Sequence, residues 1–171
     1  MDKLRDDRGL FFHAWDEGAG RRSPCLWARG NGWMAMTLAM ICETRPEGDP
    51  LRARAASLLQ RQIAALIPLQ DSSGLWHTVL DDASTYLESS AAAAFALAIA
   101  KGIRCGVLSQ ELRPVAARAW QAAQGHVSPA GDFTGVSGGT LPGDAAHYNS
   151  IPVGVERFGT GIFLLAGAAL G

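Results

Sequence analysis

The sequence predicts one all-α domain over residues 1–171, built from αα-hairpin repeats. Three observations lead to this prediction. A short aromatic motif recurs about every 60 residues, apolar residues between its copies follow helical spacing, and no stretch alternates as a β-strand would. A period of this length accommodates one tight turn and two helices. We therefore expect roughly five helices in three units that bury their faces on one another.

The recurring motif combines a turn residue, a glycine and aromatic side chains. Its first copy runs from Asp7 to His13 (DRGLFFH) and its second from Asp71 to His77 (DSSGLWH). A weaker copy covers residues 128–134 (SPAGDFT). Each copy is typical of a tight turn that leads into a short extended segment. In this alignment, His77 occupies the repeat position of His13.

Two helices are expected in the first unit. Apolar residues recur at helical spacing from residue 26 to about residue 42, and the segment RPEGDP then breaks the chain. Pro50 suits the beginning of the next helix, because proline is tolerated in a first helical turn. That helix is expected over residues 51–69, with leucine and isoleucine on one face and arginine on the other.

The second unit is expected to contain a buried helix. Ser84 or Thr85 can cap it, with Glu88 in its first turn, in a pattern close to a capping box. The segment up to about residue 104 is almost entirely small or apolar, so we expect it to be buried on most sides.

The remaining chain is expected to hold two more helical segments and a long loop. Ser109 is the expected cap of a helix that contains Trp120. Glycine and proline are frequent over residues 125–154, which predicts a loop. A last apolar segment runs from about residue 158 to residue 170.

Composition favours a globular protein and argues against several other classes. Hydrophobic residues make up 48% of the chain and charged residues 18%, so a sizeable core can form. The formal net charge is −1 with both signs scattered, which argues against nucleic-acid and membrane partners. The three cysteines lack CxxC spacing, and the longest apolar stretch, residues 91–100, is too short to span a bilayer. We expect a soluble cytoplasmic protein without a signal peptide.

The segment from Trp27 to Trp33 (WARGNGW) is the strongest candidate for a binding site. Indole faces stack on sugar rings, and the Arg29 guanidinium can hold a carboxylate in bidentate fashion. The positive potential of a helix N-terminus would also favour an anion. Together these features suit an acidic carbohydrate. The alternative is that both tryptophans are core residues and that Arg29 is an ion-pair partner.

His13, Asp16 and Glu17 are candidates for acid–base chemistry, because imidazole and carboxylates are the usual proton carriers. His13 has an alternative role as a turn-stabilising residue. A second carboxylate group over residues 81–88 has the alternative role of capping and loop hydrogen bonding. His147 and Tyr148 lie in the long loop and could reach over a pocket. Metal-ligand spacing, a nucleophile elbow, a P-loop and a dinucleotide fingerprint are all missing from the sequence.

Five motifs, in order along the chain, resemble those of the unsaturated uronyl hydrolases. They are GLFFHAWDE from Gly9, WARGNGW from Trp27, GLWH from Gly74, STYLESS from Ser84 and GTGIFLLAG from Gly159. The sequence is most similar to glycoside hydrolase family 105, the unsaturated rhamnogalacturonyl hydrolases, which is related to family 88. The resemblance extends over nearly the whole chain.

The resemblance implies an (α/α)6 barrel of the six-hairpin type, of which this chain would form about half. It also implies hydrolysis of pectin-derived oligosaccharides that carry a 4,5-unsaturated uronic acid at the non-reducing end, with no metal or organic cofactor. Trp27, Arg29 and Trp33 would line the uronate subsite and His13 would hydrogen-bond the same sugar. In this family an Asp protonates the enol-ether double bond and activates water.

The sequence departs from the family pattern at two places. The principal acid–base Asp of the family lies before the His13 motif, which leaves Asp16, in the matching Trp-Asp-Glu element, as the catalytic candidate of this chain. Residues 156–159 (ERFG) stand where a His-Gly pair is expected. Two hypotheses follow: a hydrolase half that works with a missing N-terminal half or as a homodimer, and a non-catalytic sugar-binding half-barrel. The leaving sugar stays open between rhamnose, another hexose and a sulfated unit.

Overall fold

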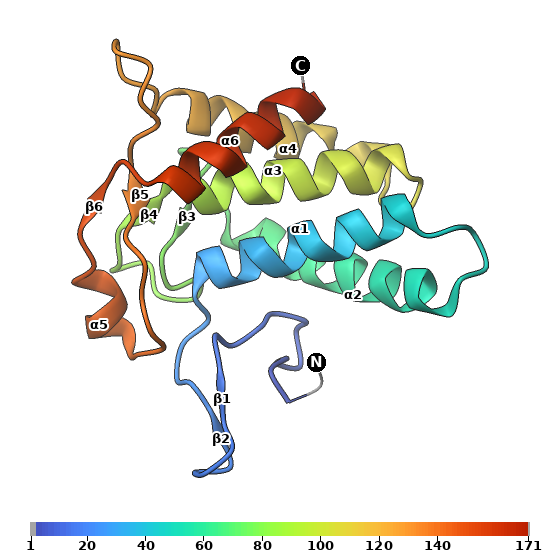
Figure 1. Cartoon of the computed structure of the whole chain (residues 1–171), viewed down its shortest axis with the longest axis horizontal. Helices are drawn as coiled ribbons and strands as arrows, with labels where there is room; N and C mark the ends of the chain where they lie inside the picture. Colours follow the sequence, from blue (N-terminus) through green and yellow to red (C-terminus); the bar gives the residue numbers. More distant parts are fainter. Residues whose placement is uncertain (1–2, 171) are drawn as a thin grey trace.

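The computed structural model describes residues 3–170, and three long helices lie side by side in one layer (Figure 1). α3 occupies the middle of this layer, between α1 and α6, while α2 packs behind α1 and α4 behind α3. The helices are α1 (Ala28–Thr44), α2 (Pro50–Leu66), α3 (Ser89–Arg104), α4 (Arg113–Gln124), α5 (Ala145–Asn149) and α6 (Arg157–Leu170). This arrangement is the predicted stack of helical hairpins.

A two-stranded antiparallel ladder precedes each helix of the front layer. β1 (Trp15–Asp16) pairs with β2 (Arg21–Arg22) before α1, β3 (Trp76–His77) pairs with β4 (Leu87–Glu88) before α3, and β5 (Val136–Ser137) pairs with β6 (Val153–Gly154) before α6. The ladders therefore gather at the N-terminal ends of the front helices, where their loops can form a shared site (Figure 1).

The repeated turn motif is real, but its register differs by one residue from the prediction. The glycines at positions 9, 74 and 131 have φ values of 111°, 94° and 90°, which L side chains rarely adopt. Their N–H groups donate to the carbonyl oxygens of Asp6, Asp71 and Ser128, in that order. Because the glycine fixes each turn, His13 corresponds to Thr78. The predicted equivalence of His13 and His77 is wrong.

Helix boundaries confirm part of the prediction and correct the rest. α1, α2 and α6 form where apolar periodicity predicted helices, although α2 ends at Leu66 and continues as a 3-10 turn, η1 (Ile67–Leu69), which contains Pro68. Glu88 itself is the N-cap of α3, since its side chain accepts a hydrogen bond from the Ala91 N–H at 2.6 Å. Ser84 and Thr85, the predicted caps, lie in the preceding turn.

The second half of the chain holds more structure than its composition predicted. Ser109 caps a 3-10 turn, η2 (Gln110–Leu112), and the helix predicted there begins only at Arg113. The loop expected over residues 125–154 contains β5, β6 and the short helix α5. Glycine and proline mark chain reversals, so their frequency concealed the short elements between the turns.

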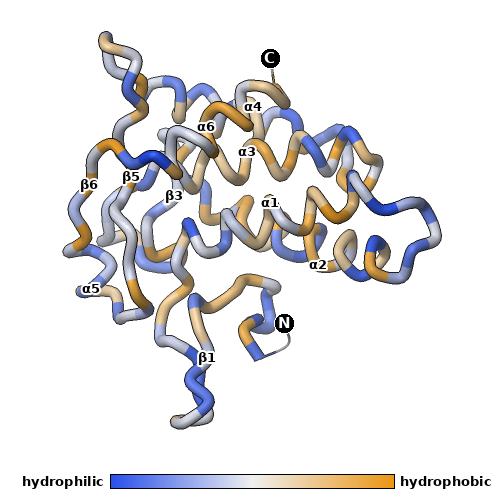
Figure 2. Tube along the Cα trace, viewed as in Figure 1, coloured by the Kyte–Doolittle hydropathy of each residue, from blue (hydrophilic) through white to orange (hydrophobic). Residues whose placement is uncertain are grey.

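α3 forms the centre of the core, as its composition predicted. Residues 89–99 are all buried (Figure 2 shows the apolar course of this helix). Small side chains let α1 approach closely, because a Cβ atom at Gly32 would lie 2.8 Å from the Ala94 Cβ. The Trp76 ring packs edge-on against Phe95, and its indole N–H donates to the Leu66 carbonyl oxygen at 2.9 Å. Within residues 3–170, no helix combines the length and apolar character needed to cross a membrane.

The stack is open on the side of its third unit. Gly9 and Gly74 lie against the backbone of α2 and α4, at Arg61 and Arg118, whereas nothing lies within 4 Å of the Cβ position of Gly131 among the described residues. On α6, Leu164 and Leu165 are 64% and 54% exposed. The third unit thus presents an uncovered apolar helix face and an uncovered turn.

Candidate functional site

Three aromatic rings from distant parts of the chain meet at the N-terminal end of α1. The His13 ring centroid lies 4.4 Å from that of Trp27, and the Tyr148 ring is stacked on Trp27 at 5.8 Å with an interplanar angle of 14°. The His13 Nδ1 atom lies 2.8 Å from the Tyr148 hydroxyl oxygen. We call these three residues the aromatic cluster.

Local structure explains why His13 and Trp27 meet. Trp27 is the residue before α1, and its backbone pairs with that of Val79. Asn31, one turn into α1 and fully buried, donates to the carbonyl oxygens of Phe11 and Trp27 at 2.8 and 3.0 Å. Its Oδ1 accepts the Phe11 N–H at 2.9 Å. Asn31 therefore ties the segment that carries His13 to the beginning of α1.

Exposure differs among the members of the cluster. Tyr148 is fully buried and Trp27 is 6% exposed, whereas His13 is of intermediate exposure. Burial lowers the pKa of His13, and electrostatic interactions with Arg29 and His147 lower it further. His13 is therefore neutral at neutral pH. Its imidazole is the accessible part of the cluster, and the two larger rings form its support.

Arg29 lies beneath the cluster and is 2% exposed. Its guanidinium carbon lies 4.6 Å from the ring centroids of both Trp27 and Phe158, so the cation is held between two aromatic faces. Its Nη1 donates to the Ser137 Oγ at 2.7 Å and its Nη2 to the Gly138 carbonyl oxygen at 2.6 Å.

The charge of Arg29 is balanced by Glu88, whose carboxylate lies 3.3 Å from Nη1 and is fully buried. Burial lowers the pKa of Arg29, and Glu88 opposes that effect. The fork of Arg29 thus engages oxygen atoms of Glu88, Ser137 and Gly138. The alternative role from the sequence, an ion-pair partner, describes its contacts, and the capping role of Glu88 is confirmed.

Asp16 and Trp33 lie apart from the cluster. Asp16 is exposed at the end of β1, where its Oδ1 accepts the Ala19 N–H at 3.0 Å. Within residues 3–170, no hydrogen bond or ion pair joins Asp16 to His13. Trp33 is 41% exposed and lies one turn beyond Arg29 on the same face of α1. The structure therefore brings together His13, Trp27 and Arg29, with Trp33 as a neighbouring open indole.

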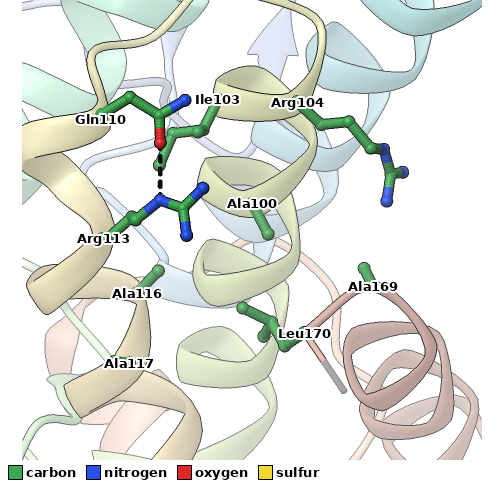
Figure 3. Close-up of a pocket in the computed structure, with 9 residues that line it drawn as sticks. All are labelled: Ala100, Ile103, Arg104, Gln110, Arg113, Ala116, Ala117, Ala169 and Leu170. Atoms are coloured by element: carbon green, nitrogen blue, oxygen red, sulfur yellow. Dashed lines mark hydrogen bonds between the residues drawn. The ribbon is translucent and has the colours of Figure 1, made fainter.

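Two surface grooves are relevant to the choice of site. One, of about 550 Å³, lies between the β1–β2 hairpin and the loop at Leu141 and Pro142, next to His13 through Ala14. The other, of about 440 Å³, lies between the far ends of α3, α4 and α6 (Figure 3). The second groove is lined mainly by alanine and other apolar residues, with an Arg113–Gln110 hydrogen bond at its edge. The first groove and the aromatic cluster are accordingly the better candidates for chemistry.

Sequence reasoning missed part of this site. The sequence predicts that Tyr148 lies in a loop that could reach over a pocket, but it does not indicate the contact with His13 that completes the cluster. Asn31 lies inside the WARGNGW motif, but its buried hydrogen bonds to Phe11 were not predicted, and Ser137 lies outside every motif. In the part of the chain that the structure describes, no three or more His, Cys, Asp or Glu side chains gather in a way that could hold a metal ion.

Comparison with known proteins gives consistent matches. The model of Glycosyl Hydrolase Family 88 matches residues 2–170. The unsaturated rhamnogalacturonyl hydrolase YesR of Bacillus subtilis is 43% identical over 57% of this chain and 29% of its own length. An unsaturated 3S-rhamnoglycuronyl hydrolase of Alteromonas sp. is 30% identical over 96% of this chain and 40% of its own length.

Solved structures agree in fold. A possible member of the GH105 family from Salmonella enterica superposes with a TM-score of 0.93 at 36% identity, over 98% of this chain and 46% of that chain. A family 105 glycoside hydrolase of C. acetobutylicum gives a TM-score of 0.89 at 29% identity, over 99% of this chain and 54% of that chain. The predicted all-α hairpin fold is thereby confirmed. The chain spans half or less of the length of these curated relatives and about half of these structures.

Proposed function

Because the chain belongs to Glycosyl Hydrolase Family 88, we propose that it forms the sugar-binding half of a hydrolase for oligosaccharides with a 4,5-unsaturated uronic acid at the non-reducing end. The single observation that carries this proposal is the half-exposed His13, held on Trp27 and Tyr148 beside an open groove. The names of two relatives, a rhamnogalacturonyl and a 3S-rhamnoglycuronyl hydrolase, support the same substrate class.

The reaction proposed is hydration of the enol-ether double bond. A proton adds to C4 of the unsaturated sugar and water adds to C5, which gives a hemiketal. The ring opens to a C5 ketone, and the hemiacetal left at C1 collapses to an aldehyde and releases the second sugar as an alcohol. This route differs from the displacement at the anomeric carbon that ordinary glycosidases perform with two carboxylates.

The residues of this chain are proposed to bind and orient the sugar. The His13 imidazole would hydrogen-bond the unsaturated uronate, and the open indole of Trp33 would pack against its flattened ring. Trp27 and Arg29 are almost fully buried. They would therefore support the sugar-binding surface from the protein side. If this chain supplies the proton itself, Asp16 is the carboxylate proposed to transfer it; otherwise the proton comes from a carboxylate outside this chain.

One observation favours a second candidate function, a half-barrel that binds the sugar without hydrolysing it. Asp16 lies in an exposed turn, and its carboxylate accepts a backbone N–H there. Among residues 3–170, no hydrogen bond or ion pair connects it to the aromatic cluster, where a general acid would have to reach the sugar. On this view, a carboxylate from another segment or another chain would complete the site. The uncovered face of α6 supports such a pairing.

Ultraviolet absorbance of an unsaturated galacturonyl-rhamnose disaccharide tests the two candidates. The conjugated enol ether absorbs and its hydration product does not. We expect the isolated chain to leave the absorbance unchanged, while a full-length relative removes it as a positive control. Loss of absorbance with this chain would instead place the proton donor within it, and Asp16→Asn would then be the first variant to measure.

A further inference from the structure

The Tyr148 hydroxyl bridges a backbone N–H and the imidazole of His13. The Gly143 N–H donates to the Tyr148 oxygen at 3.3 Å, and His13 Nδ1 lies 2.8 Å from the same oxygen. Tyr148 itself is fully buried and stacked on Trp27. The phenol is therefore held at both its ring and its hydroxyl group.

The segment around Tyr148 is built to hold this geometry. Asp144 caps α5 by accepting the His147 N–H at 2.8 Å, and the His147 Nε2 lies 2.7 Å from the Thr140 hydroxyl. Gly143 packs directly on the His147 side chain, where a Cβ atom would clash. The loop from residue 138 to residue 144 is thus fastened to α5 at His147, the residue before Tyr148.

Counting protons decides the direction of the hydrogen bond to His13. A phenol has one proton to donate and two lone pairs to accept with. The Gly143 N–H can only donate, so it occupies one lone pair. If His13 Nδ1 also donated, the phenolic proton would have no acceptor at a fully buried position, which is unfavourable. The arrangement is satisfied when Tyr148 donates to Nδ1.

We propose that Tyr148 is a positioning residue that fixes His13 in the tautomer with its proton on Nε2. The charged and titratable groups that face His13 are Arg29, His147 and Tyr148, and the positive charge of Arg29 opposes a second proton on the imidazole. His13 then offers an N–H donor from its accessible side. It serves as a donor to an acceptor oxygen on the ligand, such as a carboxylate or ring oxygen, and not as a base that removes a proton.

Only the statement that His13 donates to an oxygen atom of a uronate sugar rests on the proposed function. The tautomer is a property of the free protein and is measurable without any sugar. A failure of the hydrolase proposal would therefore leave this inference standing, and the reverse also holds.

Nitrogen-15 NMR of the histidine side chains tests the proposal on the full chain. The spectrum of a His13→Asn variant assigns the His13 signals. At neutral pH, we expect Nδ1 of His13 to show the shift of an unprotonated nitrogen and Nε2 that of a protonated one. In Tyr148→Phe, which keeps the ring and loses the hydroxyl, the two shifts should move toward each other as both tautomers become populated.

The other tyrosine of the chain provides a matched control. The Tyr86 hydroxyl is buried and has no hydrogen-bond partner among the described residues. Tyr86→Phe should therefore leave the His13 shifts as they are in the parent protein. A proton on Nδ1 in the parent protein, or unchanged shifts in Tyr148→Phe, would overturn the proposal. The measurement on the parent protein decides the matter alone if Tyr148→Phe does not fold.

Discussion

Arg29 and Glu88 form a buried ion pair that joins the beginnings of two repeat units. Glu88 accepts hydrogen bonds from the Ser90 hydroxyl at 2.7 Å and from the Ser137 N–H at 3.0 Å, in addition to its contact with Arg29. Buried charges are tolerated only when they are paired and hydrogen-bonded, and this pair meets both conditions. The pair therefore holds α1, α3 and β5 in register at the end of the fold where the aromatic cluster lies.

Removing the charge of Glu88 should be costly. Glu88→Gln leaves the Arg29 guanidinium buried without its counter-ion, and we expect the free energy of unfolding to fall by about 3 kcal/mol. Urea denaturation measures this change. The matched control is Glu43→Gln, which removes a partly exposed carboxylate paired with Lys101 and Arg104 and should cost no more than about 1 kcal/mol. Equal losses in the two variants would contradict this account of the buried pair.

The lowered pKa of His13 predicts a pH dependence of stability. The folded state binds the His13 proton less readily than the unfolded state, whose ordinary histidine pKa is about 6.5. Stability from this group is therefore fully present above that value and is lost as pH falls through the folded pKa. We expect the free energy of unfolding to fall as the pH drops below the ordinary histidine pKa of about 6.5, and to fall less in His13→Asn. Identical slopes in the parent protein and in His13→Asn would refute the prediction.

For individual residues, the sequence predicted the positions of some side chains well and those of others poorly. His13, Trp27 and Arg29 come together as their motifs indicated, because the turn and the helix start fix their positions locally. The contact between His13 and Tyr148 could not be predicted, since the residues belong to the first and third units and no periodicity relates them. The burial of Arg29 depends on Ser137 and Gly138, which are equally distant in the chain.

Among the elements, the three turns behave as copies of one unit. The same backbone hydrogen bond closes each turn, and each has a glycine of positive φ. The recurring motif predicted the turns, but their correct register follows from the glycine positions. In each turn the left-handed backbone conformation falls on the glycine, so the glycines are the residues to align. The short ladders and α5 lay outside the reach of apolar periodicity, which needs longer segments to be recognised.

Two equivalent glycines should respond differently to substitution. Gly131→Ala adds a methyl group into open space at an unfavourable φ and should cost about 1 kcal/mol. At Gly74 the same methyl group would lie 2.7 Å from the Arg118 carbonyl oxygen, so Gly74→Ala should cost about 2 kcal/mol more. Thermal or urea unfolding of the two variants measures the difference in their free energies of unfolding. A larger loss at Gly131 would show that the third turn is packed.

For the whole molecule, the uncovered third unit predicts self-association. Leu164 and Leu165 point outward from α6, and an exposed apolar face of this kind is usually covered by a partner. We expect the isolated chain to sediment as a dimer or larger species at micromolar concentration. The Leu164→Lys and Leu165→Lys double variant should sediment as a monomer with an unchanged helical circular-dichroism spectrum. A parent protein that is already monomeric would count against the predicted pairing through this face.

The central claim is that the chain carries the uronate-binding wall of a family 88 hydrolase, and calorimetric titration with the unsaturated galacturonyl-rhamnose disaccharide tests it most directly. We expect the parent chain to bind the disaccharide and Trp33→Ala to bind it at least about tenfold more weakly, a change of about 1.4 kcal/mol. Met40→Ala, an exposed residue further along α1, should bind as the parent does. Absence of binding by the parent chain, or equal affinity in the parent chain and Trp33→Ala, would contradict the claim.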